Sequence, residues 1–208
     1  MSLSELAAHL RVDRYGSFLL THAVRPALGL PVVPREGFRI EMYHDPRARL
    51  RVPVLAASVS RERLFDVFLA LLDPLDPVVD VVLETSHEQA GHGHRDLVRE
   101  HIDIPVLESH FCDFEDMLVN DGCTGVAVLS STEPIEVQFD EHKLLMVYAR
   151  DLNPFVEILE RHGLSCDNTM KLITEGEHLH TTHPHFRDEF KQLCYRLGVG
   201  EAAEHVNW

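Results

Sequence analysis

Val78-Val79-Asp80-Val81-Val82-Leu83 is the strongest strand signal in the chain, because four of its six residues are β-branched valines and a fifth is leucine. On both sides of it, apolar runs that suit strands alternate with segments whose apolar residues have helical spacing. Strands are predicted at 52–59, 78–83, 104–111 and 126–129, with helices between them at about 60–73, 94–101 and 113–121. This alternation predicts βαβ units with parallel strands over about 52–130.

An antiparallel hairpin is predicted at about 134–149. Ile135, Val137 and Phe139 alternate with polar residues, which is the period of a strand with one buried face. Helices are predicted from Asn153-Pro154 and from Pro184, because proline is well accommodated in the first helical turn. The expected fold class is α/β, or α+β, with a mixed sheet and helices packed on its faces.

The chain is expected to have three parts. Residues 1–37 form an N-terminal arm, with helix near 3–10 and around 14–24 and then a proline-rich linker. Residues 38–200 form a single α/β domain, and the polar residues 201–208 form a loose tail. The apolar side chains between the prolines of the arm could pack on their own domain or dock on a second copy, so a homodimer through this arm is one expectation.

Charge and cysteine content narrow the class of protein. Nineteen Lys and Arg against 34 Asp and Glu give a net charge of −15, which disfavours binding to nucleic acids or to an anionic membrane surface. The four cysteines form no C-x-x-C pair and suggest reduced thiols in a cytoplasmic protein. No signal-peptide pattern and no apolar run of membrane-spanning length is evident.

Histidine is concentrated in the stretch His178-Leu179-His180-Thr181-Thr182-His183-Pro184-His185. His178 and His180 would point to the same side of an extended segment. With His183, His185 and the nearby acids Glu175 and Glu177, they could bind a divalent metal such as zinc. The alternative is a polar loop whose histidines face solvent.

A second candidate site depends on the predicted parallel strands, because ligands collect beyond the carboxyl ends of such strands. Glu84 and His87 follow one predicted strand, and His110 and Cys112 lie at the end of another. Cys112 beside a histidine could be an activated nucleophile, or the group could bind metal. The alternative is that Cys112 is a buried apolar residue and that Asp113 caps a helix.

Motifs that would identify a common mechanism are absent from the sequence. It contains no Walker P-loop, no dinucleotide fingerprint, no G-x-S-x-G elbow and no H-E-x-x-H spacing. The first hypothesis is therefore a non-catalytic binding or interaction module whose small-molecule ligand, if any, the sequence does not specify. The alternative is a small metal-dependent enzyme of the hydrolase type, with a metal-activated water and Glu84 or Glu177 as the base.

Overall fold

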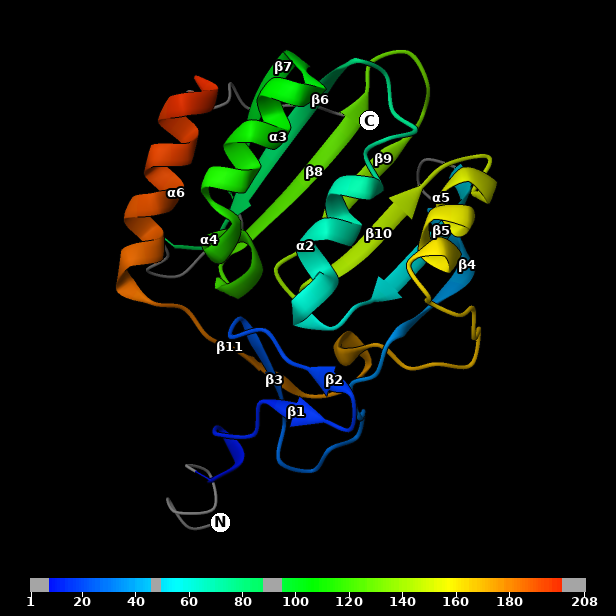
Figure 1. Cartoon of the computed structure of the whole chain (residues 1–208), viewed down its shortest axis with the longest axis vertical. Coiled ribbons are helices and arrows are strands. Elements are labelled where there is room, and N and C mark those ends of the chain that lie inside the picture. The colour runs from blue at the N-terminus through cyan, green and yellow to red at the C-terminus, as the bar shows by residue number, and fades with distance from the viewer. Residues whose placement is uncertain (1–7, 46–49, 88–94, 200–208) are drawn as a thin grey trace.

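The computed structural model describes residues 8–45, 50–87 and 95–199. Its main element is a seven-stranded sheet (Figure 1). The strands are β4 (Gly37–Asp45), β5 (Leu50–Ser58), β6 (Val78–Thr85), β7 (Arg95–Asp103), β8 (Thr124–Ser130), β9 (Glu136–Phe139) and β10 (Leu144–Tyr148). They lie in the order β4-β5-β10-β9-β8-β6-β7, and every pair of neighbours is antiparallel.

Five α-helices of the described residues cover one face of this sheet (Figure 1). They are α2 (Arg61–Ala70), α3 (Ile104–Asp113), α4 (Glu115–Asn120), α5 (Asn153–Arg161) and α6 (Pro184–Leu197). The molecule is therefore of the α+β class, with helices packed on a sheet, as the sequence predicts. The predicted hairpin at 134–149 is confirmed as β9 and β10, which pair directly.

The main core lies between the helices and the sheet. Along β6, residues alternate between partly exposed and buried, and the buried ones face the helices. Phe68 of α2 is fully buried, with ring centroids 5.6 Å from Phe111 of α3 and 5.1 Å from Phe139 of β9. This aromatic cluster joins two helices to the middle of the sheet.

Two elements are interchanged relative to the sequence prediction. Residues 104–111, predicted as a strand, belong to α3, and residues 94–101, predicted as a helix, belong largely to β7. Leu107 and Phe111 are the buried residues of α3 and lie one helical turn apart. The prediction for β7 was wrong because this strand lies at the edge of the sheet, where charged side chains are common and the alternation of apolar residues is weak.

The predicted parallel neighbours do not form. β5 and β6 run in the same direction with α2 between them in sequence, but β10, β9 and β8 separate them in the sheet. β7 and β8 likewise run in the same direction on opposite sides of β6. The connections resemble those of βαβ units, but the intervening antiparallel strands make every ladder of the sheet antiparallel. The predicted parallel-strand crevice is therefore also absent.

The N-terminal segment packs below the sheet in Figure 1, where β3 (Val24–Pro26) pairs with β11 (His178–His180). The short strands β1 (Arg14–Tyr15) and β2 (Phe18–Leu19) precede β3, where the sequence suggested helix. Residues 167–172 are irregular and lead into the 3₁₀ turn η1 (Ile173–Glu175). Residues 3–7 and the predicted tail 201–208 lie outside the described residues.

A second, smaller core fixes the N-terminal segment to the body. Ala23 and Val24 pack with Leu144 of β10 and with Met170 and Leu172. Part of the predicted N-terminal arm thus packs on its own chain. No helix among the described residues is both long enough and apolar enough to cross a membrane.

Candidate metal centre

Three histidine rings meet where β11 passes the turn between β9 and β10. His178 and His180 alternate along β11 and so project to the same side, while His142 comes from the turn. The ring centroid of His142 lies 4.9 Å from that of His178 and 4.7 Å from that of His180, and the latter two are 5.2 Å apart. Their nitrogens form one of the groups in the described residues that could hold a metal ion.

Hydrogen bonds orient each of these rings through the Nδ1 atom. Nδ1 of His178 lies 2.8 Å from the carbonyl oxygen of Gly176, and Nδ1 of His180 lies 2.8 Å from that of Gly122. Nδ1 of His142 lies 3.0 Å from a carboxylate oxygen of Asp140. Because these oxygens accept hydrogen bonds, Nδ1 carries the proton and Nε2 keeps its lone pair in all three neutral rings.

Burial and charge affect the histidines in opposite ways. Burial lowers the pKa of His142, but the hydrogen bond to Asp140 and the charges of Asp140 and Glu141 outweigh it and raise this pKa. Burial and the neighbouring histidine rings lower the pKa of His180, which favours its neutral form. A small cavity of about 30 Å³ borders His142, which is room for about one water molecule.

A buried polar network lies next to the three histidines. The carboxylate of Asp121 is fully buried and lies 2.7 Å from Nε2 of His87, whose side chain is 6% exposed. It also accepts hydrogen bonds from the hydroxyl of Thr124 at 2.6 Å and from the backbone N–H of Cys123 at 3.2 Å. Burial alone would raise the pKa of Asp121, but the hydrogen bonds outweigh it and lower this pKa. The carboxylate is therefore ionised at neutral pH.

Lys143 brings a buried cation to the same network. The backbone of this turn residue has a φ of 62°, and its Nζ atom donates a hydrogen bond of 2.7 Å to the carbonyl oxygen of Thr124. Burial lowers the pKa of Lys143 to about 8, and the negative charge of Asp121 is the largest opposing influence. One turn thus carries both a histidine of the cluster and an ammonium group held near a buried carboxylate.

The four histidines predicted as metal ligands separate into two pairs. His178 and His180 join His142, whereas His183 and His185 lie at the start of α6. The rings of that second pair stack on each other with centroids 5.6 Å apart, and both residues are exposed. The two pairs therefore provide a test and its matched control within eight residues of sequence.

The residues of the second predicted site lie on different elements. His110 and the exposed Cys112 are on α3, and Glu84 is on β6 on the face opposite the helices, where its carboxylate lies close to Gly125. Of this set only His87 enters the buried network, and Asp113 ends α3 and pairs with Arg196 instead of capping a helix.

Sequence reasoning missed His142, Asp121 and Lys143 as members of the site. The only local signal for His142 was its place in a polar turn, beside Asp140 and Glu141. Asp121 precedes a glycine and was interpreted as the end of a helix, which it is, but its carboxylate also has partners from β8 and from His87, just after β6. The local sequence around Asp121 does not predict these contacts.

Comparisons with known proteins were made at three levels. No family model matches the chain, and no match is found among the curated proteins or the solved structures.

Proposed function

We propose that this protein is a metal-dependent enzyme of the hydrolase type, with a divalent transition metal such as zinc bound by His142, His178 and His180. The spacing of the three rings is the observation that carries the proposal. Three imidazoles on one tetrahedral zinc, each with a Zn–N bond of about 2.0–2.1 Å, would have ring centroids about 5 Å apart. The centroids here are 4.7 to 5.2 Å apart.

The hydrogen bonds of the rings support the same proposal. Histidines that bind a metal usually donate the other ring N–H to a carboxylate or a backbone carbonyl, which fixes the ring and raises its basicity. His178 and His180 use backbone carbonyl oxygens for this purpose, and His142 uses the carboxylate of Asp140. All three Nε2 atoms are left to coordinate one ion.

Three protein ligands are typical of a catalytic zinc site, whereas structural sites usually have four. A metal with an open position binds water and lowers its pKa, which supplies a nucleophile at neutral pH. The chain's own contribution is to orient the three imidazoles through the hydrogen bonds at their Nδ1 atoms. The hypothesis of a hydrolase rests on the presence of three protein ligands and not four.

Zinc titration of the untagged, chelator-treated protein tests the ligand set. We expect about one zinc per chain in the wild type and in the double variant His183→Ala/His185→Ala, but none in His178→Ala/His180→Ala. Both double variants alter exposed or partly exposed residues, so circular dichroism is expected to show an unchanged fold. Full zinc occupancy after loss of His178 and His180, or no zinc in the wild type, would contradict the proposal.

Cobalt substitution tests whether the site has an open position. The visible absorption of the Co²⁺ form is expected to change when azide is added, because azide replaces a bound water. A spectrum that azide does not alter would indicate a closed, structural site and would contradict the enzymatic part of the proposal.

Asp140→Asn is expected to weaken zinc binding by about 10–100-fold, the usual effect of removing a group that supports a metal ligand. The amide oxygen of asparagine can still accept the hydrogen bond that Leu144 N–H donates to Asp140 Oδ1, so the turn is retained. Isothermal titration calorimetry measures the change in zinc affinity. Asp151→Asn is the control, because Asp151 is exposed and belongs to none of the described groups of residues that could hold a metal ion. Equal affinities of the two variants would count against a role for Asp140.

A further inference from the structure

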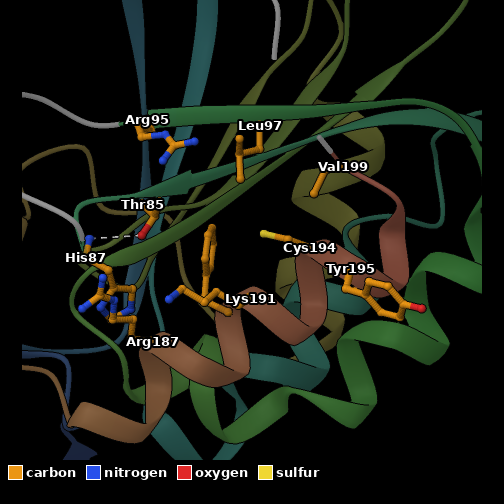
Figure 2. A pocket seen from close by; sticks show the side chains of 10 residues that line it. Thr85, His87, Arg95, Leu97, Arg187, Lys191, Cys194, Tyr195 and Val199 are labelled. Atoms are coloured by element: carbon orange, nitrogen blue, oxygen red, sulfur yellow. Dashed lines mark hydrogen bonds between the residues drawn. The ribbon is translucent and has the colours of Figure 1, made fainter. Parts of the chain in front are cut away.

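A cavity beside α6 is separate from the three histidines. It has a volume of about 430 Å³ and lies between α6 and the strands β6 and β7 (Figure 2). Its lining residues are Thr85, His87, Arg95, Leu97, Arg187, Phe190, Lys191, Cys194, Tyr195 and Val199. Volumes of this size are usual for pockets that bind small molecules.

The charge of this pocket is opposite to that of the chain. Arg187 and Lys191 are four residues apart on α6, so both side chains lie along the wall that the helix forms. Arg95 comes from β7 on the facing wall (Figure 2). None of the described lining residues is acidic, although the protein carries a net charge of −15. Such a concentration of cations attracts anions.

Arg95 is exposed and lies on the inner face of the edge strand β7. Arg95 pairs with Thr85 and Leu97 pairs with Leu83, and these partners are buried on the face that the helices cover. A charge that points inward on an edge strand can protect the edge from pairing with another chain. Here, however, the inward side chain borders a cavity whose opposite wall carries two further cations.

Apolar groups form the rest of the pocket. Leu97 extends from β7 in Figure 2, and Cys194 faces it from α6. Phe190, which is 5% exposed, adds an aromatic ring to the helix wall. Burial raises the pKa of the Cys194 thiol to about 11, so this residue stays neutral and contributes an apolar surface at neutral pH.

We propose that this pocket binds a small organic anion, with its acidic head group at Arg95, Arg187 and Lys191 and its apolar body against Leu97 and Phe190. Guanidinium groups match the geometry of carboxylates and phosphates, and the ammonium adds a point charge. This binding site goes beyond the proposed metal function and does not depend on it.

The pocket is nevertheless connected to the metal centre through a short segment of chain. His87 lines the pocket and lies 2.7 Å from the carboxylate of Asp121. The next residue, Gly122, has its carbonyl oxygen against Nδ1 of His180. Two contacts, joined by the Asp121–Gly122 peptide, therefore lie between His87 in the pocket wall and His180 of the cluster.

Calorimetric titration with decanoate and with octyl phosphate tests the proposal on metal-free protein. Both probes join an acidic head group to an apolar chain, and the tighter binder identifies the preferred head group. Lys191→Gln and Arg95→Gln are each expected to weaken binding about tenfold, the effect of losing one charge-assisted hydrogen bond. Arg150→Gln is the control, because this exposed arginine lies outside the pocket.

Three results would overturn the proposal. These are no binding of either anion, equal binding of decyltrimethylammonium, or anion affinities that Lys191→Gln and Arg95→Gln leave unchanged. Lys191 is exposed on α6, so its variant is expected to fold even if Arg95→Gln does not. Because zinc is absent from these titrations, failure here leaves the metal proposal untouched, and failure of zinc binding leaves the pocket untouched.

Discussion

Asp121→Ala is expected to lower the free energy of unfolding by about 3 kcal/mol, because it leaves buried hydrogen-bond donors without their acceptor and removes the charge that most favours the buried ammonium of Lys143. Asp121 is the charge that most favours the ammonium form of the buried Lys143. The same substitution removes the acceptor for the Thr124 hydroxyl and the partner of the His87 ring. Denaturation in guanidinium chloride, followed by circular dichroism, measures the loss.

A double-mutant cycle separates the charge effect from the hydrogen bonds. Lys143→Met keeps the length of the side chain but removes the charge, so Asp121→Ala/Lys143→Met is expected to be more stable than the sum of the single losses by about 0.5–3 kcal/mol. The exposed Asp188→Ala is the control and is expected to change stability by about 0.5 kcal/mol or less. Strictly additive losses would show that Asp121 and Lys143 do not compensate each other.

Elements with a regular apolar period could be predicted from sequence alone. β6 could be predicted from its four β-branched valines, and β9 from the alternation of Val137 and Phe139 with polar residues before a polar turn. α5 and α6 have proline in their first turns, and the glycine after α6 adopts a φ of 64°. In each case the propensity of the local residues and their burial favour the same structure, so the local sequence is sufficient to predict the element.

Elements whose burial depends on distant partners could not be predicted in this way. β7 is largely exposed because it has a neighbour on one side only, and its charges conceal its strand pattern. The parallel arrangement predicted for 52–130 failed for a related reason. β9 and β10 come late in the sequence, yet they occupy the middle of the sheet between β5 and β8.

The ligands of the candidate metal site likewise include some that the sequence could predict and one that it could not. His178 and His180 could be proposed because two residues of spacing place them on one side of a strand. His142 could not, because it lies 36 residues earlier and reaches β11 only through the packing of the β9–β10 turn. The separation of His183 and His185 also required the structure, because α6 begins at Pro184 and turns the chain away from the strand direction.

Gly122→Val is expected to destabilise the protein by about 3 kcal/mol or more, because the added side chain has no space. A Cβ atom at Gly122 would lie 2.8 Å from the carbonyl oxygen of Thr181 and even closer to that of Ala23. These are backbone atoms of the segments that carry β3 and β11, and Thr181 N–H donates to Ala23 O at 2.8 Å. One segment or the other must move, and the histidines of β11 move with it.

The expected displacement couples stability to metal binding. The carbonyl oxygen of Gly122 accepts the hydrogen bond that orients His180, so zinc affinity of the folded variant is expected to fall by about tenfold or more. Gly29→Val is the matched control, because a Cβ there meets no atom within 4 Å, and we expect a change of about 0.5 kcal/mol or less. Urea denaturation and zinc titration of both variants measure the two effects. If Gly122→Val lowered stability but left zinc affinity intact, β11 would not depend on this backbone contact, and the ring of His180 would be held by other means.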